Sequence, residues 1–151
     1  MRRFNFARWI LPLCLVASLA RGADGRIAKV LPQFTDRRGR VALSPSLYDR
    51  DAYQAELRLT PAKRSGLRFQ VQWTGRRDVE LRLKLELRGI HNGKATAQVL
   101  EMPVRRKGWG RTWTAVDFVG KDYATFGELL AWRATLWEGE SEIAEQKSFL
   151  W

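Results

Sequence analysis

Strict alternation of apolar and charged side chains over residues 79–88 constrains this chain more than any other feature of its sequence. Five apolar residues alternate with five charged ones: Val79, Leu81, Leu83, Leu85 and Leu87 against Glu80, Arg82, Lys84, Glu86 and Arg88. A period of two places every leucine on one face of a β-strand and every charge on the other. The pattern predicts a half-buried strand in a largely antiparallel sheet.

Residues 67–73 repeat this alternation, and a short polar turn at residues 74–78 joins the two segments. We therefore expect these two strands to pair as a hairpin. Further strands are predicted at residues 27–34, 95–104 and 113–119, and residues 130–137 and 142–149 predict a closing hairpin. Good helix formers at residues 128–134 leave a helix open there. Asn92-Gly93 favours a tight turn, and Pro32 and Pro103 favour strands at a sheet edge.

One helix is predicted between the first two strands. Ser46 and Asp49 form a capping box at its start, and Pro61 ends it. Four residues share one face at helical spacing, which we expect to be the buried face: Tyr48, Ala52, Ala55 and Leu59. Short strands with regular turn signals predict a mainly β fold. We expect an immunoglobulin-like two-sheet antiparallel β-sandwich with one short helix, as a single domain over residues 23–151.

Residues 1–22 have the order of features typical of a signal peptide. Arg2, Arg3 and Arg8 precede an apolar run at residues 9–20, and small residues stand before Ala23. An uncleaved N-terminal anchor is the alternative. Cleavage predicts a periplasmic or secreted protein with no stable membrane span, and it removes the only cysteine.

Four runs of sequence resemble a group of small exported bacterial proteins. They are VLPQF at 30–34, LSPSLYDRDAYQA at 43–55, RSGLRFQVQW at 64–73 and AEQKSFLW at 144–151. The resemblance covers nearly all of the chain after residue 22. It implies export and a compact β-rich domain. No activity is attached to that group, so the resemblance transfers no functional residues.

The chain is basic, with 27 Lys and Arg against 16 Asp and Glu and a formal charge of +11. Without residues 1–22, 23 basic side chains face 16 acidic ones, a net charge of +7. Residues 58–111 carry +10 and residues 112–151 carry −4. This polarity could steer anionic partners, but we expect the two segments mainly to neutralise each other across neighbouring strands.

The sequence offers little catalytic chemistry. His91, the only histidine, would need Asp78 or Asp117 for a Ser–His–Asp triad. It lies beside the Asn-Gly turn, where we expect a solvated side chain, and no Gly-x-Ser-x-Gly motif is present. One histidine and one cysteine supply too few ligands for zinc. We predict no metal, no cofactor and no enzymatic activity.

Paired carboxylates are the other catalytic candidates, because a glycosidase needs two acids that face one another. Asp49 and Asp51 lie on different sides of the predicted helix. Glu138, Glu140 and Glu142 lie in and around a turn, where acids usually serve solubility. Neither group predicts a catalytic pair.

A basic, tryptophan-containing segment is the strongest binding candidate. Six side chains lie within nine residues: Arg105, Arg106, Lys107, Trp109, Arg111 and Trp113. Arginine and lysine would bind the acidic groups of a glycan, while tryptophan stacks on a sugar face. Nucleic acid would suit the same chemistry, but an exported protein rarely meets it. A structural edge loop is the alternative. Tyr53 is a further candidate contact residue, unless it covers the end of the sandwich.

These patterns predict an exported, non-enzymatic binding module. Its partner would be an envelope or secreted protein or an anionic glycan. One alternative is a hydrolase acting on envelope polymers. Another is an assembly subunit that adds a strand to a neighbour's sheet, with the apolar residues 149–151 as its only sequence support. A tail that plugs the core explains those residues equally well. The sequence does not fix the oligomeric state.

Overall fold

The computed structural model describes residues 25–106 and 108–151, which form seven strands and two helices. In chain order they are β1 (Arg26–Asp36), α1 (Leu47–Leu59), β2 (Arg64–Thr74), β3 (Glu80–His91), β4 (Lys94–Arg105), β5 (Thr112–Val119), α2 (Gly120–Phe126), β6 (Glu128–Glu138) and β7 (Ser141–Lys147). A 3-10 turn, η1 (Pro61–Lys63), follows α1. The predicted signal segment, residues 1–22, lies outside the described residues.

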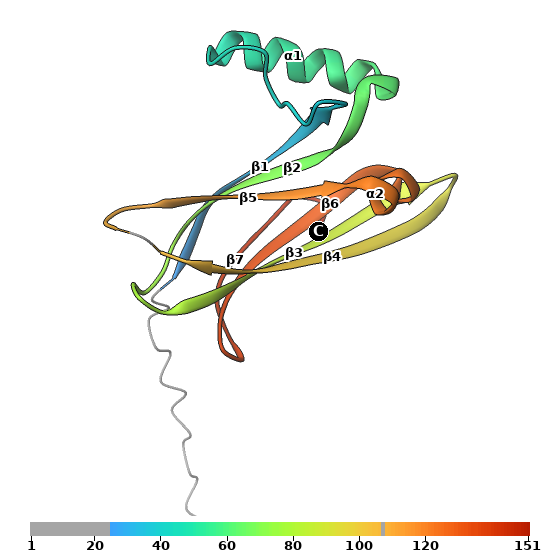
Figure 1. Cartoon of the computed structure of the whole chain (residues 1–151). Coiled ribbons are helices and arrows are strands. Elements are labelled where there is room, and N and C mark those ends of the chain that lie inside the picture. The colour runs from blue at the N-terminus through green and yellow to red at the C-terminus, as the bar shows by residue number, and fades with distance from the viewer. Residues whose placement is uncertain (1–24, 107) are drawn as a thin grey trace, which may run out of the picture.

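Two antiparallel sheets pack face to face (Figure 1). Their strand orders are β1-β2-β5 and β4-β3-β6-β7, the arrangement A-B-E and C′-C-F-G of an immunoglobulin-like sandwich. The predicted sandwich is therefore confirmed. The predicted hairpin between β2 and β3 is wrong, because the chain crosses between sheets at residues 75–79. β1 and β5 already occupy both hydrogen-bonding edges of β2, which leaves none for β3.

The core lies between the sheets and follows the predicted alternation. Its centre comes from the inward residues of β2 and β3, each at most 2% exposed: Leu67, Phe69, Val71, Trp73, Leu81, Leu83, Leu85 and Leu87. Trp73 is buried with its indole N–H satisfied, since Nε1 donates to Thr114 Oγ1 at 2.9 Å. Apolar burial on both inner faces holds the two sheets together.

The short connections follow local sequence signals. Asn92 and Gly93 have φ values of 49° and 74° and form the tight turn between β3 and β4. Residues 128–134 belong to β6 rather than to a helix, and β6 and β7 form the closing hairpin. Pro32 lies on β1 and Pro103 on β4, and both strands are sheet edges as predicted.

Helix α1 begins and ends near the predicted residues but presents the opposite face. Ser46 Oγ accepts from the Asp49 amide at its start. The side chains predicted to be buried are exposed, with Tyr48 at 82% and Leu59 at 83%, whereas Gln54 and Leu57 are buried. α1 stands away from the two sheets, beside the end of β1 (Figure 1), so no core faces the apolar stripe. Helix α2 was not predicted.

The antiparallel register divides the connections between two ends of the sandwich. Residues 75–79, 106–111 and 139–140 connect β2–β3, β4–β5 and β6–β7 at one end, here called the loop end. Helix α1, the β3–β4 turn and α2 lie at the other, here called the helical end. At the loop end and the helical end, side chains no longer alternate between a core face and a solvent face as they do along the strands.

Candidate functional site

The sandwich brings most of the predicted binding segment to the loop end. The segment runs from the end of β4 to the start of β5, so its ends belong to different sheets. Lys107 lies outside the described residues. Tyr53 lies on α1 at the helical end, so it is not part of the same site. The candidate site is therefore the β4–β5 connection together with the neighbouring β2–β3 connection.

Trp109 is the most exposed tryptophan of the loop end. Its side chain is 87% exposed, and the guanidinium carbon of Arg77 lies 3.9 Å from its ring centroid. Arg77 belongs to the β2–β3 connection, so a cation–π contact joins two loops that are 32 residues apart in sequence. The contact covers one face of the indole with a cation and orients the ring.

Arg106 is a structural member of this cluster. Its Nη1 donates to the Gly75 carbonyl at 2.8 Å, and its Nε is buried with no hydrogen-bond partner among the described residues. Arg76 joins the β2–β3 loop to the third loop, because its Nη1 lies 2.6 Å from Oε1 of Glu138, the last residue of β6. The three loops are thus tied together by arginines. Replacing Arg106 is expected to disturb the loop as well as remove a charge.

The remaining predicted residues line the rim of the loop end. Arg105 ends β4, is exposed and pairs in register with Glu80. Arg111 is exposed, and its Nη1 reaches Gln72 Oε1 at 3.5 Å. Trp113 lies on β5 beside Gln72 and is 47% exposed. Arg105 and Arg111 make no ion pair with any described residue, so their charges face solvent.

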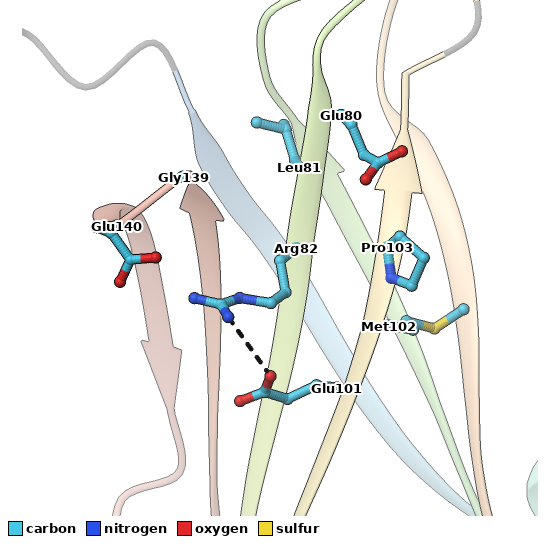
Figure 2. Close-up of a pocket in the computed structure, with 8 residues that line it drawn as sticks. All are labelled: Glu80, Leu81, Arg82, Glu101, Met102, Pro103, Gly139 and Glu140. Atoms are coloured by element: carbon cyan, nitrogen blue, oxygen red, sulfur yellow. Dashed lines mark ion pairs between the residues drawn. The ribbon is translucent and has the colours of Figure 1, made fainter.

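An acidic groove of about 460 Å³ opens beside this cluster, between β3, β4 and the β6–β7 turn (Figure 2). Glu80, Glu101 and Glu140 line it, and Arg82 Nη1 approaches Glu101 Oε2 at 3.7 Å. Met102 adds an apolar wall. The loop end therefore has a basic, aromatic side and an acidic side.

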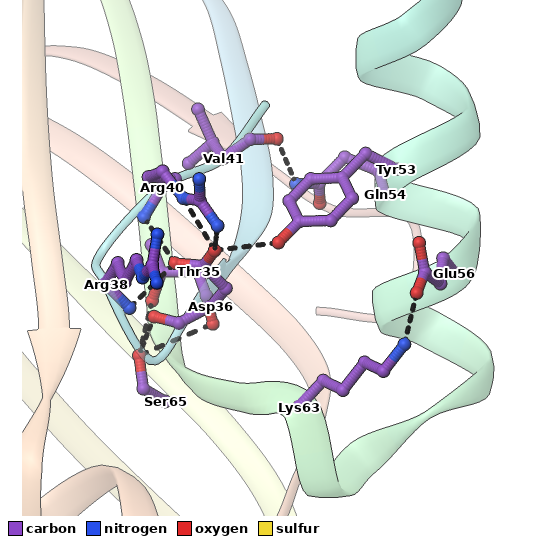
Figure 3. Close-up of polar contacts among 10 residues, drawn as sticks. All are labelled: Thr35, Asp36, Arg38, Arg40, Val41, Tyr53, Gln54, Glu56, Lys63 and Ser65. Carbon is purple, nitrogen blue, oxygen red and sulfur yellow. Dashed lines mark hydrogen bonds and ion pairs between the residues drawn. The ribbon is translucent and has the colours of Figure 1, made fainter. Parts of the chain in front are cut away.

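Tyr53 belongs to a polar network rather than to a free surface (Figure 3). Its hydroxyl donates to Asp36 Oδ2 at 2.7 Å, which corrects the expectation that this ring is free to contact a partner. Asp36 Oδ1 accepts from the amides of Arg38 and Arg40 at 2.8 and 2.9 Å, and Oδ2 accepts from Arg40 Nε at 2.8 Å. The network fixes the loop between β1 and α1.

The electrostatics of Asp36 fit this structural role. Burial disfavours its charged form, but hydrogen bonds from the Arg40 amide, from Tyr53 and from the Arg40 guanidinium outweigh burial. Together they hold the pKa of Asp36 well below its usual range. The bond to Asp36, followed by burial, raises the pKa of Tyr53. Asp36 stays ionised and Tyr53 stays neutral near pH 7, so neither is poised for proton transfer.

The structure separates the residues that a Ser–His–Asp triad would need. His91 ends β3 at the helical end, whereas Asp78 precedes β3 at the loop end. Asp117 forms a bidentate pair with Arg68 at 2.6 and 2.9 Å on the outer face of the other sheet. A triad needs hydrogen-bond contact between its members, and neither aspartate offers that contact to His91.

The turn carboxylates also have separate partners. Glu138 binds Arg76, while Glu142 Oε2 lies 3.0 Å from Arg133 Nη2. Glu140 lines the acidic groove. The described residues contain no group of three or more metal-ligating side chains.

Cross-strand pairs of the predicted kind do form between the basic and acidic segments. Arg68 and Asp117 join β2 to β5, and Arg76 joins Glu138. The apolar tail does not plug the core, since Phe149 is 101% exposed and Leu150 70%. Among the described residues, Arg105 and Arg111 take no part in such pairs.

Sequence reasoning missed Arg77. Its position in a polar turn was visible, but its contact with Trp109 depends on two loops meeting across the sandwich.

No helix among the described residues is long and apolar enough to cross a membrane. Comparison with known proteins found no match to the chain among family models, curated proteins or solved structures.

Proposed function

We propose that the protein is an exported, non-enzymatic binding module that holds an anionic glycan at the loop end. The observation that carries this proposal is Trp109, whose ring is 87% exposed and rests against Arg77 at 3.9 Å instead of packing into the core. A flat exposed indole can stack on a sugar face. Guanidinium groups beside it can bind a carboxylate, sulfate or phosphate in a bidentate manner.

The position of the site in the fold supports the same proposal. Loops at one end of an immunoglobulin-like sandwich form the recognition surface of antibody variable domains, and the corresponding connections form the loop end here. This support is an analogy at the level of the fold. The residues argue more specifically, because Arg105 and Arg111 keep their charges in solvent on either side of Trp109.

A binding titration with polygalacturonate, and with neutral dextran as the reference, tests the proposal. Trp109→Ala should weaken polygalacturonate binding about fivefold, the equivalent of about 1 kcal/mol. The double variant Arg105→Ser/Arg111→Ser should weaken binding and flatten its dependence on salt, because screening acts on exposed charges. Arg106 is left in place because it ties the loops together.

A matched control removes two exposed cations from the helical end instead. Lys94→Ser/Lys121→Ser changes the net charge by the same amount, and both lysines are exposed. This variant should bind polygalacturonate like the unaltered protein. If both double variants lose affinity equally, the attraction is a net-charge effect and the loop-end site is refuted. Unchanged affinity in Trp109→Ala would remove the stacking contact from the account.

A further inference from the structure

The helical end contains a hollow with two adjoining lobes of about 350 and 490 Å³. Both volumes fall in the range of small-molecule sites. The two lobes lie side by side, because five residues line both: Arg58, Arg64, Tyr123, Gly127 and Glu128. They come from α1, β2, α2 and β6, elements that the antiparallel fold brings together at this end.

The smaller lobe, here called the apolar lobe, has an apolar patch beside its polar groups. Leu67 is 2% exposed, and Phe34 and Leu129 are partly buried against the core. Pro32 completes this apolar surface. Such a surface favours the hydrocarbon part of a ligand, because contact with it removes apolar area from water.

Two arginines give this apolar lobe a positive rim. Arg64 Nε donates to the Leu57 carbonyl at 2.5 Å and its Nη2 donates to the Arg58 carbonyl, which fixes the guanidinium at the last turn of α1. The same guanidinium lies 4.1 Å from the centroid of the Phe34 ring. Neither Arg58 nor Arg64 makes an ion pair with any described residue. The hydrogen bonds of the Arg64 guanidinium go to carbonyls, so no carboxylate compensates its charge.

The other polar groups of the hollow can complete the recognition of an acid. Burial raises the pKa of the Tyr123 phenol, although Arg64 acts in the opposite direction. Tyr123 is therefore neutral near pH 7 and able to donate a hydrogen bond. His91 lines the larger lobe. Glu128 is the one carboxylate among the described residues that line the hollow, and it makes no ion pair with Arg58 or Arg64.

The wall of this hollow leaves no room for a side chain at Gly127. Its φ is +82°, and a Cβ there would lie 2.1 Å from the Ile90 carbonyl oxygen. The backbone of β6 thus approaches the end of β3 as closely as only glycine allows. This close approach fixes the distance between His91 and the residues of β6.

We propose that this hollow binds a small amphiphilic carboxylate, with its hydrocarbon part in the apolar lobe and its carboxylate between Arg58 and Arg64. The class includes medium-chain fatty acids. This site lies at the opposite end of the sandwich from the glycan site and does not depend on it. It pairs an apolar patch with guanidinium groups that no described carboxylate compensates, which select an acid over an alcohol of equal length.

Calorimetric titration of the full protein with decanoate and with decanol tests this site. We expect decanoate to bind with one-to-one stoichiometry and decanol to bind at least about tenfold more weakly. Equal affinity for the two would overturn the role of the arginines. Absence of decanoate binding up to about 1 mM would overturn the site itself.

Two variants locate the ligand. Arg58→Gln should weaken decanoate binding about fivefold or more and leave decanol binding unchanged, while Lys94→Gln, an exposed cation at the same end, should change neither. Leu129→Trp should fill the apolar lobe and abolish binding of both ligands, with circular dichroism as the check on folding. Decanoate binding that survives Leu129→Trp unchanged would refute the placement. Arg64 is not the test residue because it also holds the end of α1.

Discussion

Replacing Asp36 by asparagine tests whether one buried carboxylate holds the loop between β1 and α1. In Asp36→Asn the Oδ1 atom still accepts from the amides of Arg38 and Arg40. The new amide nitrogen faces the Arg40 guanidinium, so a charge-assisted bond of 2.8 Å and an ion pair of 2.7 Å are lost. Tyr53 can turn its hydroxyl to accept from the new amide, so its bond is retained in reversed form.

The expected loss follows from those contacts. One charge-assisted hydrogen bond at a buried carboxylate contributes about 2–3 kcal/mol, and the exposed partner Arg40 keeps the value at the lower end of the range for a buried pair. We therefore expect Asp36→Asn to lower the free energy of unfolding by about 2–3 kcal/mol in urea at pH 7. Tyr53→Phe, the matched control, removes one hydrogen bond to the same carboxylate and should cost about 1–2 kcal/mol.

The pH dependence gives an independent check. The pKa of Asp36 in the folded protein lies below its ordinary value of 3.8, so its contribution is fully present above about pH 4. The contribution is lost as the pH falls toward the folded pKa. The difference in stability between the unaltered protein and Asp36→Asn should therefore shrink as urea unfolding is repeated from pH 7 down to about pH 3. A loss under about 0.5 kcal/mol at pH 7, or a difference independent of pH, would refute the reasoning.

Two further predictions use matched pairs of substitutions, each measured by urea unfolding. Leu57→Ala should cost about 2–4 kcal/mol because Leu57 is 0% exposed, while Leu59→Ala, at 83% exposed, should stay within about 0.5 kcal/mol; equal losses would contradict the observed orientation of α1. Gly127→Ala should cost about 2–4 kcal/mol, since its Cβ would meet the Ile90 carbonyl. Gly120→Ala has a similar φ of +76° but open space around the Cβ, so it should cost about 1–2 kcal/mol. Equal losses at the two positions would show that φ alone decides and would contradict the role of the Ile90 carbonyl.

Local alternation was enough to predict most of the sandwich. The strands around Phe69 and Leu83 need only period-two patterning, and the Asn92-Gly93 turn needs only backbone preference. The β2–β3 hairpin failed because sheet membership depends on partners far along the chain. β5 and β6 supply those partners, and no turn signal near residue 75 encodes them.

Helix α1 shows a second limit. The spacing of Tyr48 and Leu59 correctly places both on one face, but periodicity does not say whether any surface faces that stripe. Attachment instead comes from Leu57 and from the Gln54 amide, a polar group that hydropathy assigns to solvent. The binding segment was predicted from composition, whereas the helical-end hollow arises from residues of four separate elements and has no local signal.

The hydrogen bonds of Gln54 limit how the edge strand β1 can pair with a strand of another molecule. Its Oε1 accepts from the Phe34 amide at 2.8 Å, and its Nε2 donates to the Phe34 carbonyl at 2.9 Å. One side chain thus satisfies both the backbone N–H and the backbone C=O of a residue on an edge strand. Pro32, two residues earlier, has no amide hydrogen to offer. β1 therefore cannot template a foreign strand along this stretch. The other edge of the three-stranded sheet is β5, which has no such block among the described residues, so Thr112–Val119 is the first segment in which to place aggregation-blocking substitutions.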